Sequence, residues 1–152
     1  MISEFLIPIA SGAAGTAAFA VLYHVKGRYV VLSMLGGAIT TMVLVTCLRI
    51  FNGNNLISNM AAAFIGGIYC NLCAHRMKAP VPVFMIPTLF PLVPGKSLYF
   101  SMISLVQHYK GEFMDNFFTA AEISFGIAVG TMLTTVVCNM ILSRNKERHN
   151  KI

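Results

Sequence analysis

Long apolar stretches alternate with short polar ones along the chain. Residues 29–48, 50–75 and 123–143 contain no Asp, Glu, Lys or Arg. A helix of about 20 mainly apolar residues is long enough to cross the hydrocarbon core of a bilayer. The pattern therefore predicts an all-α integral membrane protein rather than a soluble domain.

The polar interruptions divide the chain into about five predicted transmembrane helices. The interruptions are NGNN at 52–55 and HYKGEFMDN at 108–116, and no soluble domain fits between them. We expect a single transmembrane helical bundle over residues 1–142 and a basic cytoplasmic tail over 143–152. The predicted spans cover residues 5–24, 29–50, 55–74, 80–106 and 117–142.

The composition agrees with this reading. Only 11% of residues are charged and 57% are hydrophobic, whereas a soluble domain carries about 25% charge. The N-terminal stretch has no Lys or Arg before its apolar run, so it lacks the basic region of a secretion signal. We expect it to be retained as the first span.

Basic residues are distributed unevenly over the predicted loops. Cytoplasmic loops of membrane proteins collect Lys and Arg, which predicts an N-terminus outside and a C-terminus in the cytoplasm. The same rule explains the net charge of +6, so no nucleic-acid partner is expected. One side would hold Lys26, Arg28, Arg76, Lys78, Arg144, Lys146, Arg148 and Lys151, and the other only Arg49 and Lys110.

The fourth segment, residues 80–106, is interrupted by proline. Five of the six prolines in the chain lie between residues 80 and 94. Proline has no backbone N–H, and lipid offers no partner to a carbonyl that loses its hydrogen bond. We therefore predict that PLVPG at 91–95 is an unwound link between two half-helices, the second beginning near Lys96 or Ser97.

A half-helix that begins at membrane depth presents unpaired amides and the positive end of its dipole, which transporters use to hold anionic groups. Lys96 adds a positive charge, Ser97 is expected to cap the new helix, and Tyr99 offers a hydroxyl. The alternative is a structural re-entrant turn, with Lys96 reaching the interface. The residues predicted to line a substrate pathway here are Pro91, Pro94, Gly95, Lys96, Ser97 and Tyr99.

Glu122 is the only acidic residue within the five predicted spans. A carboxylate in lipid normally faces a cavity or a partner and often handles protons. Glu122 is therefore added to the predicted pathway, either coupling transport to protons or pairing with Lys96. The alternative is that it reaches water near the outer end of its span.

Small residues recur at four-residue spacing, which places them on one helix face and lets backbones approach closely. We expect a compact bundle or subunit contacts at these positions. The pairs are Ser11 with Gly15, Gly36 with Thr40, Ala62 with Gly66, Ala63 with Gly67, and Gly126 with Gly130.

The broken segment resembles the threonine/serine exporter family. The resemblance is carried by Pro87, by PLVPG at 91–95 and by Tyr99, followed by an apolar helix. It implies the small membrane subunit, of the C-terminal-half type, of a split two-component exporter. Such a subunit would lie in a bacterial inner (plasma) membrane and act with a larger membrane subunit.

The resemblance further implies gradient-driven export of a small carboxylate substrate, either a dicarboxylate such as succinate or threonine and serine. Additional copies of the chain are a second class of expected partner. The alternative function is a non-transporting scaffold or assembly subunit. An enzyme is not expected, because no G-x-S-x-G motif occurs and no second intramembrane acid faces Glu122. The sequence predicts no cofactor and no metal site.

Overall fold

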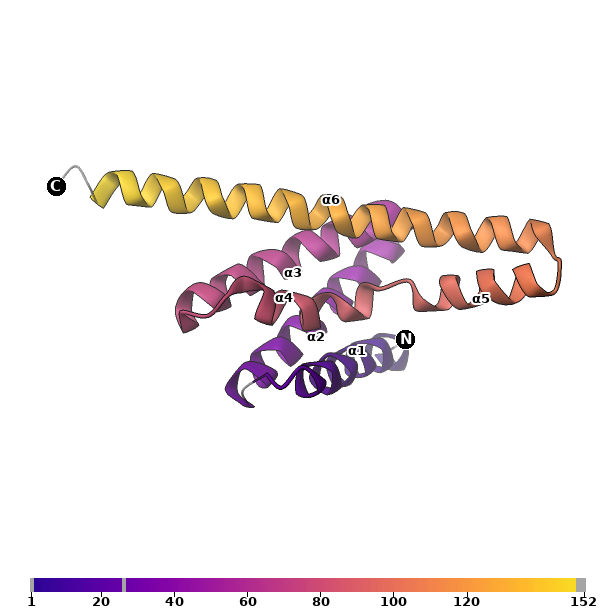
Figure 1. Cartoon of the computed structure of the whole chain (residues 1–152), viewed down its shortest axis with the longest axis horizontal. Coiled ribbons are helices and arrows are strands. Elements are labelled where there is room, and N and C mark those ends of the chain that lie inside the picture. Colours follow the sequence, from indigo (N-terminus) through magenta and orange to yellow (C-terminus); the bar gives the residue numbers. More distant parts are fainter. Residues whose placement is uncertain (1, 26, 150–152) are drawn as a thin grey trace.

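The computed structural model describes residues 2–25 and 27–149, and these are helical almost throughout. Six α-helices and one short 3-10 turn make up the described residues, and they contain no strand (Figure 1). In chain order the elements are α1 (Ile2–Leu22), α2 (Gly27–Ile50), α3 (Asn55–Met77), α4 (Val81–Leu89), η1 (Phe90–Leu92), α5 (Gly95–Val106) and α6 (Lys110–His149).

Short turns with special backbone conformations separate the helices. Gly53, with φ of +83°, occupies a conformation that glycine adopts at little cost. Asn54 then caps α3, because its side-chain oxygen accepts a hydrogen bond from the Ile57 amide at 3.2 Å. Lys78 closes the other end of α3 in the left-handed conformation. The predicted boundary at NGNN is confirmed.

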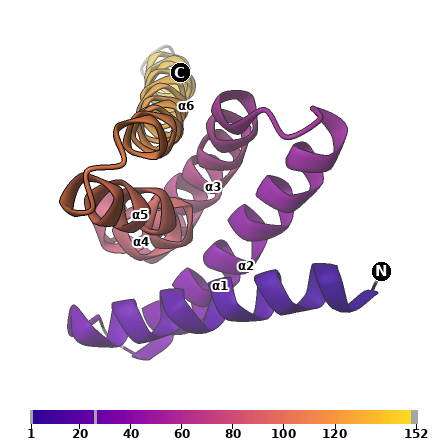
Figure 2. The same cartoon turned by 90° about the vertical axis from the view of Figure 1, so that its right-hand side faces the viewer.

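Helix α3 lies in the middle of the molecule, in contact with α2, α4 and α6 (Figure 1). α1 packs mainly on α2 and lies across the direction of α6, which Figure 2 views almost end-on. α5 packs chiefly against the first part of α6. The two form a helical hairpin that extends past the ends of the other helices (Figure 1). This hairpin, residues 95–125, is called the arm below.

Where helices cross, a glycine on one helix faces a threonine on another. The missing side chain lets the backbones approach. The hydroxyls of four of these threonines donate to helix carbonyls, whereas the buried Thr88 hydroxyl has no hydrogen-bond partner among the described residues. Thr134, for example, donates to the Phe64 carbonyl of α3 at 3.0 Å. The facing pairs are Gly12 with Thr41 and Thr16 with Gly37 (α1–α2), Thr40 with Gly66 (α2–α3), Gly36 with Thr88 (α2–α4) and Gly67 with Thr134 (α3–α6).

Most of the predicted small-residue pairs lie at these contacts. The pairs on α2 and α3 are buried, and Gly126 and Gly130 of α6 lie directly against the backbone of α3. The prediction for α1 is wrong by one position: Ser11 is exposed and Gly15 faces open space. The buried face of α1 instead contains Gly12 and Thr16, because that face is the one α2 covers.

Three helices within the described residues are long and apolar enough to cross a membrane. These are α2, α3 and the Lys110–Ile141 part of α6, and the bent pair formed by α4–η1 and α5 would make a fourth span. α1 provides a shorter apolar helix, Leu6–Leu22. The predicted all-helical membrane class is confirmed. The predicted count of five is approximate, because three helices meet the criterion and the bent fourth segment would make a fourth.

The prediction that residues 108–116 form a polar loop is wrong, because α6 already begins at Lys110. Glu112 lies in its first turn, where the positive end of the helix dipole stabilises an acid. The side-chain amide of Asn116 donates to the Glu112 carbonyl at 2.8 Å. Polar residues that suggested a loop are therefore compatible with a helix start.

Helix α6 continues far beyond the predicted end of the last span at residue 142. Its backbone is helical to His149, so most of the predicted tail 143–152 extends the helix, and residues 150–152 lie outside the described residues. A helix of 40 residues is about 60 Å long, roughly twice the hydrocarbon core of a bilayer. Part of α6 therefore lies outside the membrane.

Candidate functional site

The break in the fourth segment follows directly from two prolines. Pro91 has no amide to donate to the Pro87 carbonyl one turn earlier, and the Phe90 amide bonds that carbonyl instead. The chain tightens into η1 and then extends at Val93, with ψ of 129°. α5 begins immediately after Pro94, and the two helical pieces are bent by 54°. The predicted proline break is therefore confirmed.

The second half-helix begins slightly earlier than predicted. α5 starts at Gly95, so only Val93 and Pro94 are unwound within the predicted link. The Gly95 amide donates to the Val93 carbonyl at 2.8 Å, which closes the tight turn. Ser97 lies inside the first turn, and α5 has no side-chain cap. The prediction that Ser97 caps the helix is wrong because Pro94 already occupies the cap position.

A threonine from another helix holds the broken segment in place. The Thr40 hydroxyl of α2 lies 3.2 Å from the Thr88 carbonyl of α4, and it shares its single proton between that acceptor and the Gly36 and Gly37 carbonyls of its own helix at 3.1 and 3.0 Å. The Thr88 side chain itself is fully buried against Gly36, and its hydroxyl has no hydrogen-bond partner among the described residues. A polar group is thus enclosed behind the break. The irregular backbone is supported by protein on this side, as membrane proteins require.

The start of α5 leaves backbone donors unpaired. Its first helical hydrogen bond runs from the Leu98 amide to the Pro94 carbonyl at 3.0 Å. The amides of Lys96 and Ser97 precede that bond, so no helix carbonyl is available to them. A side chain added at Gly95 would meet nothing within 4 Å. Gly95 and Lys96 are both exposed, so the start of α5 is accessible.

Six of the seven predicted pathway residues lie together in residues 91–99, called the elbow below. Pro94 is buried and Pro91 is half-buried, so the prolines form the inner wall of the bend. The side chains that carry chemistry face outward: Lys96 is exposed, Ser97 is half-buried and Tyr99 is 63% exposed. The elbow therefore combines a rigid inner wall with an accessible polar surface.

The seventh residue, Glu122, lies on α6 and is exposed. The Ser104 hydroxyl contacts the Glu112 carboxylate at 3.5 Å, which sets the register of the arm. Both residues lie on the side of that contact away from the hairpin turn: Lys96 is about 12 Å from it on α5, and Glu122 is about 15 Å from it on α6. The two residues therefore lie at nearly the same level of the hairpin. Neither forms an ion pair with any described residue.

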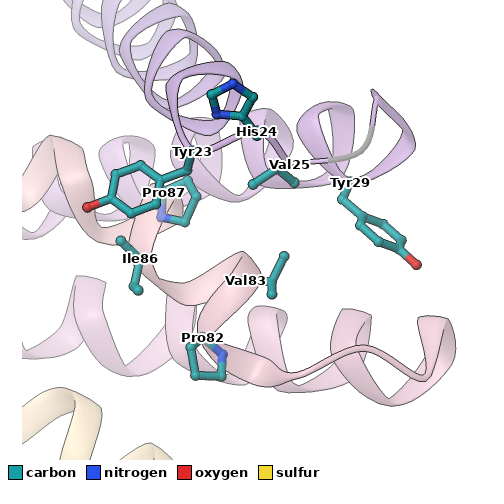
Figure 3. Close-up of a pocket in the computed structure, with 8 residues that line it drawn as sticks. All are labelled: Tyr23, His24, Val25, Tyr29, Pro82, Val83, Ile86 and Pro87. Atoms are coloured by element: carbon teal, nitrogen blue, oxygen red, sulfur yellow. The ribbon is translucent and has the colours of Figure 1, made fainter.

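A separate pocket of about 350 Å³ lies between the α1–α2 turn and α4. Figure 3 shows Pro87 and Ile86 of α4 facing the turn, with the hydroxyls of Tyr23 and Tyr29 pointing away from each other. The walls are mainly apolar, and His24 contributes an imidazole at the rim. Its other lining residues are Val25, Pro82 and Val83.

Sequence reasoning missed this pocket and the role of Thr40. The four-residue spacing of Gly36 and Thr40 did indicate a packed face, but it gave no partner on α4. Two tyrosines beside a predicted span end are typical of a membrane interface and were the available signal for the pocket.

A model of the protein family described as "Threonine/Serine exporter, ThrE" matches residues 9–137 of the chain. The matched range begins in α1 and extends well into α6, and it includes the whole elbow and Glu122. No curated protein and no solved structure matches the chain.

Proposed function

The chain belongs to the threonine/serine exporter family, and from that membership we propose that it is one subunit of a gradient-driven exporter of small carboxylate metabolites. The family and the apolar helices make it a multi-pass membrane protein of an exporter family. The substrate, the partner subunit and the orientation are the steps that the proposal adds.

The observation that carries the proposal is the elbow at the start of α5. Its unpaired amides at Lys96 and Ser97 and the positive end of the helix dipole suit an anionic oxygen. Lys96 adds a full charge and Tyr99 a hydroxyl, and both side chains are exposed. In the proposed site a substrate carboxylate lies against this surface. Pro91, Pro94 and Gly95 fix the bend and leave room for it.

Glu122 is the proposed proton-coupling group. It is the only charged residue between Asn116 and Ile141, at nearly the level of the elbow. A carboxylate in that position can take up and release a proton while a substrate passes, which would couple export to the proton gradient. No ATP-dependent step is needed in this scheme.

The proposed substrate is a dicarboxylate such as succinate, or threonine and serine, because each presents a carboxylate to the elbow. Many carriers bind substrate between two complementary halves. This chain supplies one half, and a larger membrane subunit supplies the other. In the proposed orientation the N-terminus lies outside. The end of the bundle that gathers the α1–α2 turn, the α3–α4 turn and the C-terminus then faces the cytoplasm (Figure 1).

The test compares two glycines at helix starts. A Cβ added at Gly95 or at Gly111 would meet no atom within 4 Å, so both positions begin a larger side chain in open space. Gly95→Leu should lower substrate efflux at least about tenfold, because it fills the space beside the α5 amides, while Gly111→Leu should export normally. Both variants should assemble as the unaltered protein does. Normal efflux by Gly95→Leu would remove the elbow from the pathway. Loss of assembly in that variant alone would favour the scaffold role.

A further inference from the structure

The arm exposes large apolar side chains that the other described helices leave uncovered. α5 packs chiefly against α6, and the hairpin extends past the rest of the bundle in Figure 1. The Ser101 hydroxyl is buried within the hairpin without a hydrogen-bond partner among the described residues. The large exposed side chains of the arm include Tyr99, Phe100, Met102, Phe117, Phe118 and Phe125.

Two opposite charges lie at the base of this apolar surface. Lys96 is the only Lys, Arg, Asp or Glu in residues 96–109, and Glu122 is the only one in 116–141. Both are exposed and lie at nearly the same level of neighbouring helices, yet neither forms an ion pair with a residue that the structure describes. A charge on a lipid-facing surface is costly unless it finds a partner. Lys96 and Glu122 are therefore a cation and a carboxylate without an ion-pair partner among the described residues at the base of the arm, whereas Lys110, Glu112 and Asp115 lie near its turn.

These two charges are complementary to those on a second copy of the same arm. In a two-fold dimer, any contact from residue i to residue j is repeated from j to i. A single contact type, Lys96 with Glu122, then occurs twice and neutralises four charges. No foreign protein is needed to supply the matching groups.

We propose that two copies of the chain pair through their arms, with Lys96 of each copy bound to Glu122 of the other. The proposal rests on the proposed function, since it places the second copy's Glu122 at the elbow. That carboxylate occupies the anionic site when no substrate is bound, and an arriving substrate carboxylate displaces it. The site at each elbow is therefore incomplete in a single copy.

The test uses charge reversal in pairs of full-length copies that carry two different affinity tags and are co-expressed in a membrane. Recovery of one tag with the other measures association. Lys96→Glu expressed with itself brings like charges together at both contacts, and so does Glu122→Lys with itself. Each should lower co-recovery by about tenfold or more, because like charges in an interface are strongly unfavourable. Arg76→Glu, a charge reversal at the far end of α3, should leave it unchanged.

Mixing the two single variants is the decisive step. When one copy carries Lys96→Glu and the other Glu122→Lys, both intermolecular contacts regain opposite charges, so co-recovery should return to the unaltered level. An intramolecular pair would not be rescued by mixing, because one copy would keep two acids and the other two lysines. The double variant in a single chain should also associate, which shows that the reversed residues allow folding.

Three results would overturn the proposal: no co-recovery of unaltered copies, undiminished co-recovery of the single variants, or no rescue on mixing. The last would assign the two charges to each other within the chain or to a different protein. Association without efflux of any substrate would contradict the proposed function and leave the dimer standing. Efflux by a chain that does not self-associate would contradict the dimer and leave the proposed function standing.

Discussion

Replacing Gly130 by alanine tests the close packing of α6 on α3 most directly. A methyl group at this position would lie 2.5 Å from the Met60 carbonyl oxygen and 2.9 Å from the Ala63 Cβ. The nearest atom belongs to the α3 backbone and cannot rotate away, so the two helices must separate by roughly 1 Å to reach ordinary contact. Overpacking of this kind costs about 1–3 kcal/mol.

Gly15→Ala is the matched control. It lies in α1 with nothing within 4 Å of the added methyl group, so it gains only the better helix propensity of alanine, about 0.5–1 kcal/mol. Because both variants share that gain, the difference between them isolates the packing cost at Gly130. For a chain of this size the difference corresponds to a gap in melting temperature of about 2–12 °C.

The assay is thermal unfolding of the purified full-length variants in one detergent, followed by loss of monodisperse protein. Gly130→Ala should melt below the unaltered protein, and Gly15→Ala at or slightly above it. Equal melting temperatures for the two variants would refute the packing argument, because they would show that α3 and α6 have room for a methyl group.

The remaining predictions concern the elbow and its support. Thr40→Val removes the hydroxyl that contacts the Thr88 carbonyl and should lower stability by about 0.5–1.5 kcal/mol in the same melting assay. Thr46 is exposed and its hydroxyl bonds only within its own helix, so Thr46→Val should cost less than about 0.5 kcal/mol. Lys96→Gln removes the charge beside the α5 amides and should raise the substrate concentration for half-maximal efflux at least about tenfold, since a hydrogen bond to a charged group contributes about 1.5–3 kcal/mol. An unchanged value would take Lys96 out of substrate binding. Glu122→Gln cannot exchange a proton and should abolish the pH dependence of efflux; retained dependence would assign proton coupling to another group.

Much of the fold was predictable because its causes are local. Apolar runs set α2 and α3, and the missing amides of Pro91 and Pro94 break the fourth segment wherever the rest of the chain lies. The start of α6 was mispredicted because polar residues such as Glu112 and Asn116 serve a helix start as well as a loop. Sequence composition does not separate the two.

The parts that escaped prediction depend on contacts between distant segments. The buried face of α1 is set by where α2 crosses it, so Ser11 and Gly15 looked as suitable as Gly12 and Thr16. The projection of the arm follows from the 54° bend, whose size no local pattern specifies.

The candidate site divides in the same way. The elbow residues lie next to one another in the chain and could be found from the proline spacing. Thr40, which supports the elbow, is 48 positions away from its acceptor residue Thr88 and was identified only as a packing residue.

Efflux from preloaded cells that lack their own exporters shows whether the chain is a subunit of an exporter. Labelled threonine and labelled succinate are compared in parallel, with this chain expressed alone and together with the larger membrane subunit. If this chain supplies one half of the exporter, one label should leave the cells, and only when both chains are present. Retention of both labels in cells that contain an assembled complex would contradict it and would leave the chain as a scaffold subunit.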